Sequence, residues 1–145
     1  MLPNLRDIRL FENNLSGELP AELGKHSPLS NLEVSSNNLS GPLPESLCAN
    51  GMLEDIVVSN NSLSGELPKN LIDRVSLNNL MISNNSFHGE FPEKIWSLPN
   101  LTTLVIESTG FTGALPAELS ENISHIDMGN NKFSGLHVWC CVATS

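Results

Sequence analysis

A short phrase recurs along the chain at a constant spacing of 24 residues. Its most regular position is a glycine, which occurs five times in the same local setting, as Gly17, Gly41, Gly65, Gly89 and Gly113. The first copy reads Asn-Asn-Leu-Ser-Gly-Glu-Leu-Pro, and all five copies keep the glycine and the proline. A fixed period of this length is typical of stacked structural units, because a single unit of this size cannot bury its own apolar face. The repeat therefore predicts an elongated array.

Apolar residues precede each phrase with the spacing L-x-x-L-x-L-x-x-N. In the second unit these positions are Leu29, Leu32, Val34 and Asn37. The L-x-L pair alternates with period two, which predicts a short strand with one buried face. Stacking places these strands side by side, so we expect a parallel sheet of about six short strands.

An asparagine ends this spacing in almost every unit. The turn after a buried strand leaves backbone N–H and C=O groups pointing into the interior, where they need partners other than water. An Asn side chain carries both a donor and an acceptor, so it can satisfy one turn in each unit. We therefore expect a structural ladder of Asn13, Asn37, Asn61, Asn85 and Asn131, with Thr109 in place of the asparagine in the fifth unit.

The whole pattern is that of a leucine-rich repeat solenoid, a curved α/β-type horseshoe with a concave parallel sheet. The glycine and proline segment of each unit is expected to cross the convex side in irregular or 3-10 structure. We assign residues 2–135 to the array, as five 24-residue repeats and one degenerate C-terminal repeat, because Gly135 follows Gly113 by 22 residues. Residues 136–145 fit no repeat and form a non-repeat tail.

The phrase L-S/T-G-x-L-P resembles that of plant-type leucine-rich repeats, as in receptor-like kinase ectodomains and polygalacturonase-inhibiting proteins. Residues 29–65, with the segments 47–51 and 55–58, together with segments 89–92 and 95–96, resemble the HAESA-like receptor kinases most closely. This resemblance implies a module on the extracellular side of the plasma membrane or secreted. It also implies a secreted peptide or protein ligand and a co-receptor with a leucine-rich repeat ectodomain.

Composition and motifs argue against several other functions. The chain has 16 acidic and 7 basic residues, so it offers no basic surface for nucleic acid or anionic lipid. Ser124, His125 and Asp127 adjoin on one strand, but no nucleophile turn or oxyanion donors accompany them. His137 with the Cys140–Cys141 pair lacks a second pair of ligands at metal spacing. We therefore expect no catalytic site, no cofactor and no metal.

The serine/threonine kinase motifs of the resembling family do not occur in this sequence, and neither does a signal peptide or an apolar run long enough to span a membrane. We expect the chain to be an internal piece of an ectodomain or a truncated relative of one. An array without capping units exposes the apolar edges of its terminal units, so we expect both ends to fray.

The concave face is where function is expected, because its outward side chains are free of packing. Val57, Met81 and Val105 form an apolar strip there, flanked by hydroxyls and amides, which suits an extended peptide. The predicted ligand-binding residues are Glu33, Asp55, Val57, Ser59, Asn79, Met81, Ser83, Thr103, Val105 and Glu107.

Three alternatives stay open at this point. Single exposed Val and Met residues are common and need have no function. An inhibitor of the polygalacturonase-inhibitor kind would bind a folded enzyme through a basic or aromatic concave cluster, which this face mostly lacks. The third alternative is that the chain is a truncated fragment without function of its own.

Peptide receptors of the wider class often carry an Arg-x-Arg pair that holds a peptide carboxylate. Here Arg9 is followed at that spacing by Phe11, so we assign no such clamp.

Six N-x-S/T sequons are candidates for N-glycosylation if the chain is secreted. Four lie in the asparagine-rich turns, where asparagine is also expected for the ladder. The other two, Asn100 and Asn122, lie just before a strand and are expected to be better placed. The six are Asn14, Asn38, Asn60, Asn84, Asn100 and Asn122.

Overall fold

The computed structural model describes residues 2–135. The predicted tail of residues 136–145, with His137, Trp139, Cys140 and Cys141, lies outside the described residues.

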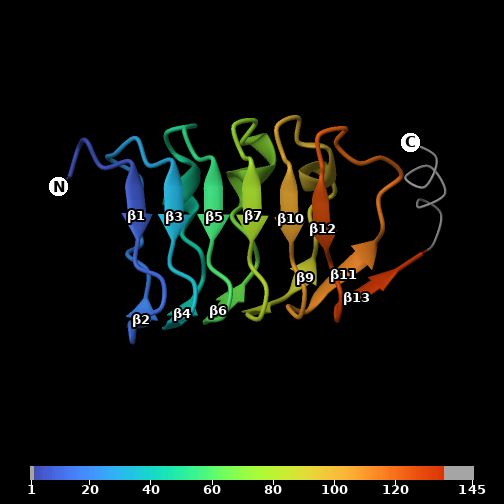
Figure 1. Ribbon diagram of the computed structural model, residues 1–145, viewed down its shortest axis with the longest axis horizontal. Coiled ribbons are helices and arrows are strands. Elements are labelled where there is room, and N and C mark those ends of the chain that lie inside the picture. Colours follow the sequence, from blue (N-terminus) through green and yellow to red (C-terminus); the bar gives the residue numbers. More distant parts are fainter. Residues whose placement is uncertain (1, 136–145) are drawn as a thin grey trace.

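A six-stranded parallel sheet runs the length of the molecule (Figure 1). Each strand has three residues, and the order along the sheet is β1 (Asp7–Arg9), β3 (Asn31–Glu33), β5 (Asp55–Val57), β7 (Asn79–Met81), β10 (Thr103–Val105) and β12 (His125–Asp127). The register pairs equivalent positions of successive units, as Leu32 with Ile56 and Ile56 with Leu80. The middle residue of each strand faces the interior, which confirms the predicted alternation.

A second set of short parallel strands, which the sequence reasoning did not anticipate, lies along one flank of the molecule (Figure 1). These strands are built from the glycine-containing phrase. One sheet contains β2 (Ser16–Glu18), β4 (Asn38–Gly41), β6 (Ser62–Gly65) and β8 (Ser86–Phe87), and the other contains β9 (Gly89–Glu90), β11 (Phe111–Ala114) and β13 (Lys132–Ser134). Gly41 is required here: its φ is +75°, and a Cβ would come within 2.7 Å of the Glu18 side chain.

Three 3-10 helices follow the prolines of the second, third and fourth units, as predicted for the convex side. They are η1 (Glu45–Cys48), η2 (Lys69–Asp73) and η3 (Glu93–Ser97), and in each case a proline is the residue before the helix. Proline is favoured at the start of a helix because its ring fixes φ near the value needed there. Its missing N–H costs no hydrogen bond, since an N–H at this position has no partner within the helix. None of the helices within residues 2–135 is long and apolar enough to cross a membrane.

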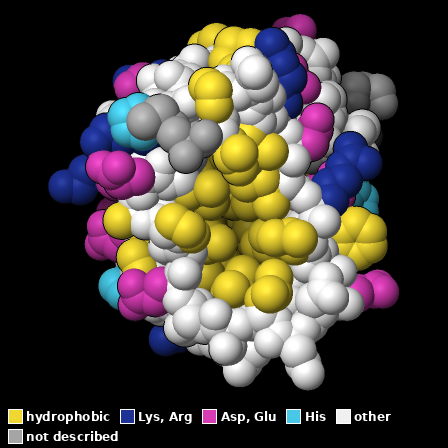
Figure 2. Space-filling model, turned by 90° about the vertical axis from the view of Figure 1, so that its left-hand side faces the viewer, with side chains coloured by type: hydrophobic (Ala, Val, Ile, Leu, Met, Phe, Trp, Pro, Cys, Tyr) yellow, Lys and Arg dark blue, Asp and Glu magenta, His cyan; other side chains and the backbone are white. Residues whose placement is uncertain are grey.

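The N-terminal end of the array is open. Viewed end-on, apolar side chains gather around a hollow at the centre of this end (Figure 2). Leu2, Leu10, Phe11 and Leu15 are all 40% exposed or more, whereas the equivalents of Leu10 and Leu15 in the second unit, Val34 and Leu39, are buried. Stacking therefore buries the interior of the units that have a neighbour on each side.

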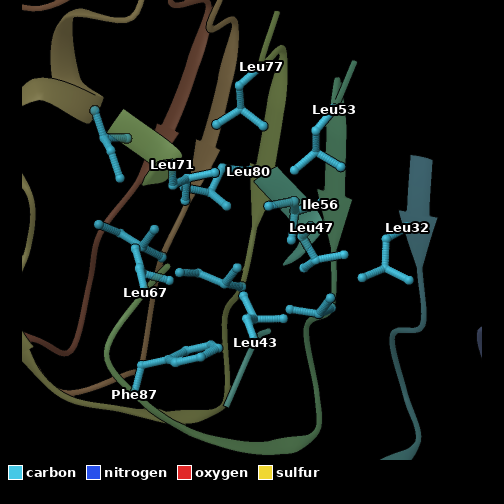
Figure 3. Packing of buried hydrophobic residues seen from close by; sticks show 14 of the residues in the cluster. Leu32, Leu43, Leu47, Leu53, Ile56, Leu67, Leu71, Leu77, Leu80 and Phe87 are labelled. Atoms are coloured by element: carbon cyan, nitrogen blue, oxygen red, sulfur yellow. The ribbon is translucent and has the colours of Figure 1, made fainter. Parts of the chain in front are cut away.

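The core is a continuous column of aliphatic side chains between the six-stranded sheet and the 3-10 helices (Figure 3). Leu32, Ile56 and Leu80 of the sheet are fully buried, and Leu47 and Leu71 meet them from η1 and η2. Toward the C-terminal end the core contains more aromatic side chains, and five of them pack together: Phe87, Phe91, Trp96, Phe111 and Phe133. Trp96 is 1% exposed, so it belongs to the core.

Candidate functional site

The open face of the molecule is the side of the six-stranded sheet that is turned away from the core. Three columns of side chains cross it. The first is Asp7, Asn31, Asp55, Asn79, Thr103 and His125; the second is Arg9, Glu33, Val57, Met81, Val105 and Asp127. Alternation along each strand puts both columns on one face, because the residue between them points inward. The register places Val57, Met81 and Val105 on adjacent strands, so the predicted apolar strip exists as a contiguous surface.

The third column follows the strand ends and consists of Phe11, Ser35, Ser59, Ser83, Glu107 and Gly129. Backbone hydrogen bonds hold its members beside one another. The N–H of Asn60 donates to the carbonyl of Ser83 at 2.9 Å, and the N–H of Asn84 donates to that of Glu107 at 3.0 Å. The ten residues predicted as ligand-binding therefore lie together in four neighbouring units. Their role in binding stays a prediction.

The asparagine ladder beneath this face follows the predicted chemistry. Asn85 is 8% exposed, and its Nδ2 donates to the carbonyls of Val58, Ile82 and Ser83 at 3.1–3.2 Å. Its Oδ1 accepts the N–H of Leu63 at 2.9 Å. One side chain thus joins its own turn to the preceding unit and holds the strand ends of the open face in place.

Thr109 replaces the asparagine in the fifth unit without breaking the ladder. Its Oγ1 lies 3.0 Å from the carbonyl oxygen of Ile106 and 2.6 Å from Oδ1 of Asn131. That same Oδ1 accepts the backbone N–H of Gly110 and of Phe111. Asn131 therefore serves the turn that Thr109 is too short to fill.

Each turn also contains a residue with positive φ directly before the ladder position, which the sequence reasoning missed. Their φ values lie between 52° and 58°, at Glu12, Ser36, Asn60, Asn84, Ser108 and Asn130. Most of these residues are asparagine or serine. This pattern could have predicted the positive φ, because Asn in particular tolerates the left-handed region. Nδ2 of Asn84 donates to Oδ1 of Asn60 at 2.8 Å, so the two sequon asparagines of this column bond to each other.

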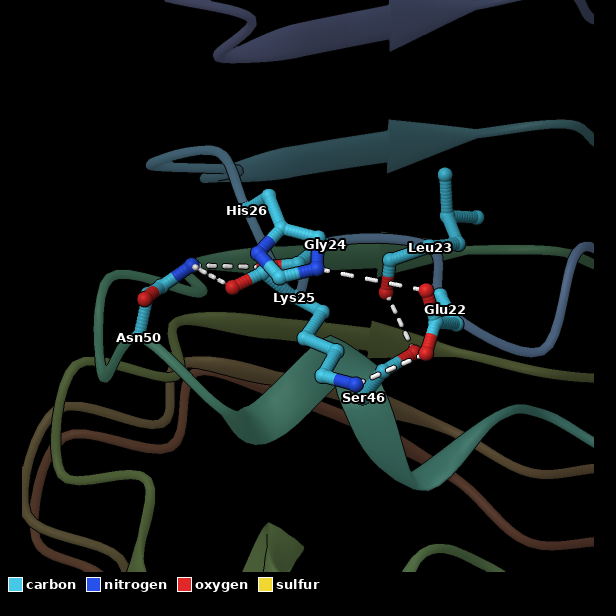
Figure 4. Close-up of polar contacts among 7 residues, drawn as sticks. All are labelled: Glu22, Leu23, Gly24, Lys25, His26, Ser46 and Asn50. Atoms are coloured by element: carbon cyan, nitrogen blue, oxygen red, sulfur yellow. Dashed lines mark hydrogen bonds and ion pairs between the residues drawn. The ribbon is translucent and has the colours of Figure 1, made fainter. Parts of the chain in front are cut away.

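The other sequons fall into two groups. Nδ2 of Asn100 donates to the carbonyl of Val75, and that of Asn122 to the carbonyl of Pro99, each at 2.6 Å. Asn50, which is not in a sequon, makes a similar bond: its Nδ2 donates to the carbonyl of Gly24 in the preceding unit (Figure 4). Asn14 and Asn38 are exposed, and within residues 2–135 their side chains make no hydrogen bond. Asn14 and Asn38 therefore differ from the other four sequon asparagines in having side-chain amides that are not engaged within residues 2–135. Occupancy of all six sequons stays a prediction.

Cys48 lies in η1, away from the open face. It is a buried free thiol, and burial raises its pKa to about 11, with the Arg74 charge acting in the opposite direction. A protonated buried thiol is a packing group. Among the described residues, no three His, Cys, Asp or Glu side chains are grouped as metal ligands.

Known proteins share both the sequence pattern and the architecture. The sequence profile described as Leucine Rich Repeat matches residues 4–26, 28–50 and 76–98. The Arabidopsis receptor kinase HAESA, solved with the peptide hormone IDA and the co-receptor SERK1, is 37% identical with a TM-score of 0.89, over 93% of this chain and 23% of that chain. A TDR receptor is 38% identical with a TM-score of 0.79, over 88% of this chain and 22% of that chain.

A shorter relative decides the family. The BIR2 ectodomain from Arabidopsis thaliana is 30% identical with a TM-score of 0.75, over 88% of this chain and 68% of that chain. This chain belongs to the plant leucine-rich repeat receptor kinase ectodomains. The resemblance seen in the repeat phrase is thereby confirmed. This leucine-rich repeat chain spans under a quarter of the length of the HAESA and TDR receptor chains. A comparison with curated protein sequences gave no match.

Proposed function

We propose that this chain is a ligand-binding module, not an enzyme, that holds an extended peptide on the open face on the extracellular side of the plasma membrane. The observation that carries the proposal is the apolar strip of Val57, Met81 and Val105 on three adjacent strands, bordered by polar columns on both sides. Apolar side chains of a peptide gain by leaving water on such a strip, while amides and hydroxyls beside it satisfy the peptide backbone.

The relatives support a peptide as the ligand. HAESA was solved with the peptide hormone IDA and the co-receptor SERK1, and another relative, RGFR1, with RGF2. By analogy, a leucine-rich repeat co-receptor is the second partner that we propose for this chain. Binding of a folded enzyme, as by an inhibitor protein, has less support. Within residues 2–135 the three columns of the open face contain one arginine, Arg9, and one Phe, Tyr or Trp side chain, Phe11.

The test is a pair of substitutions on the strip with a matched pair elsewhere. Val57→Asp and Met81→Asp place a charge where the peptide rests, and we expect each to weaken a peptide selected on the wild-type chain about thirtyfold. Isothermal titration calorimetry measures the change.

Val75→Asp and Met52→Asp are the controls, because both residues are exposed and lie outside the open face. They should leave the affinity unchanged. Equal losses in all four variants, or none in the strip variants, would place the peptide somewhere other than the open face.

A further inference from the structure

We propose that the peptide bound by the open face carries Lys or Arg side chains on both sides of an apolar centre. This inference rests on the peptide-binding function proposed above and adds the charge of the ligand to it.

The charges on the open face are almost all negative. Its three columns hold five carboxylates, those of Asp7, Glu33, Asp55, Glu107 and Asp127, and a single arginine. That arginine, Arg9, lies with Nε 3.7 Å from Oε1 of Glu33 at the N-terminal end of the face. Within the described residues, the other four carboxylates form no ion pair with a Lys or Arg side chain. An anionic ligand would meet repulsion here, and a cationic one would be attracted.

Polar atoms without partners on the same face point to a ligand independently of these charges. Ser83 is 5% exposed, and its Oγ has no hydrogen-bond partner within residues 2–135; the same is true of Oγ in Ser35 and Ser59. The alternation that turns Ile82 into the core turns Ser83 to the open face. Buried hydroxyls without a partner are costly, so a row of three favours an incoming group that supplies hydrogen bonds.

In the first column, two amide donors are already used by neighbouring carboxylates. Asn31 donates its Nδ2 to Oδ1 of Asp7, and Asn79 donates to Oδ1 of Asp55 at 2.6 Å. This arrangement leaves Oδ1 of Asn31 buried, with no donor among the described residues. An amide oxygen beside carboxylates is an acceptor site that the N–H groups of Lys or Arg fit.

The carboxylates flank the apolar strip at both ends. Glu33 and Asp55 lie on β3 and β5, whereas Glu107 and Asp127 lie in the last two units. Around Gly129 the two later side chains converge: a Cβ there would stand 3.6 Å from Oδ1 of Asp127 and 3.7 Å from Cγ of Glu107. With no side chain at Gly129, that space is open to a ligand group.

The spacing of the two acidic ends sets the spacing of the basic residues. From β3 to β12 the sheet advances by four strand steps, or about 19 Å at about 4.8 Å per step. An extended peptide covers this distance in about six residues. The ligand therefore has two basic residues about six positions apart, with apolar side chains between them.

The experiment is selection of random twelve-residue peptides displayed on phage against the immobilised chain, followed by sequencing. We expect Lys and Arg to exceed Asp and Glu about threefold or more among the enriched peptides, on both sides of an apolar centre. A triple variant with Glu33→Gln, Glu107→Gln and Asp127→Asn should lose that excess. Asparagine at position 127 keeps the oxygen that accepts the N–H of Gly129.

The matched control removes three exposed carboxylates away from the open face, by Glu93→Gln, Glu118→Gln and Glu121→Gln. It should select the same basic peptides as the wild type. For one synthetic peptide from the selection, we expect the open-face triple variant to weaken binding about tenfold and to flatten its dependence on salt.

The outcomes separate the two proposals. Enrichment of neutral or acidic peptides that Met81→Asp abolishes would overturn the charge inference and leave the peptide-binding function standing. Basic enrichment that the control triple variant removes as well would show a general charge effect, and would also overturn the inference. No enrichment of any peptide, with circular dichroism showing a folded chain, would overturn both.

Discussion

At the residue scale, the ladder asparagines of the inner units join the turns of neighbouring units. Asn85 bonds to two successive units, whereas Asn13, at the open end, donates only to Leu10 and Phe11 of its own turn. The same residue type at the same repeat position therefore has different energetic weight, because burial and the number of bonds differ.

This difference gives a prediction with an internal control. Asn85→Ala leaves three carbonyls and the N–H of Leu63 without their partner, so we expect the free energy of unfolding to fall by about 2–4 kcal/mol. Asn13→Ala removes bonds that water replaces, and should cost less than about 1 kcal/mol. Urea denaturation followed by circular dichroism measures both. Similar losses at the two positions would contradict the bridging role of the side chain.

At the element scale, the 3-10 helices complete the core from behind the sheet. Leu47 and Cys48 of η1 are both buried, and the thiol is held protonated by its surroundings. Because the folded state raises the pKa of Cys48 from 9.0 to about 11, the folded chain binds this proton more tightly than the unfolded chain does. The contribution of the protonated Cys48 thiol to the free energy of unfolding is fully present below about pH 9. It is lost as the pH rises toward about 11.

The prediction concerns a chain in which Cys140→Ser and Cys141→Ser leave Cys48 as the remaining thiol. We expect its unfolding free energy to fall between about pH 8.5 and about pH 10.5, and to fall less when Cys48→Ala is added. A thiol reagent should also react with Cys48 in urea and not in buffer alone. Rapid labelling of the folded chain would show that η1 does not bury the thiol.

At the scale of the whole molecule, stability comes from the contacts between neighbouring units, so it depends on position in the array. The unit that contains β1 has a neighbour on one side within the described residues, and Leu10 and Leu15 of this unit are exposed. The units of β5 and β7 have a neighbour on each side and contain the most fully buried leucines and isoleucines.

Hydrogen exchange with mass spectrometry tests this gradient. We expect amides of β1 and β2 to exchange at least about tenfold faster than those of β5 and β7, because fraying begins where a neighbour is missing. Leu10→Ser, on the exposed edge, should change protection in the first unit only. Uniform exchange throughout residues 2–135 would mean that the array unfolds as one cooperative unit.

Much of this architecture could be predicted because the units are stacked. Once Leu32, Ile56 and Leu80 are recognised as equivalent, stacking puts them side by side whatever the other residues are. The same reasoning found the asparagine ladder and the contiguous strip of Val57 and Met81. Residues 24 positions apart meet on the open face, so periodicity alone is enough there.

The flanking strands were missed because they do not follow that period. β2 pairs Gly17 with Leu39, an offset of 22 residues, so glycine does not meet glycine. The offset depends on how one coil leans against the next, which is a property of packed backbones. Which side-chain amides find partners is decided in the same way, as for Asn100, whose Nδ2 reaches the carbonyl of Val75.

The sequence by itself determined the repeat, the side of each strand that is buried and the ladder that joins the units, since each follows from local alternation and a fixed period. Only the tertiary structure decided the flanking sheets, the buried Ser83 hydroxyl without a partner and the grouping of carboxylates around Gly129. These features arise from contacts between different positions of neighbouring units, and the orientation of each side chain depends on the partners it finds there.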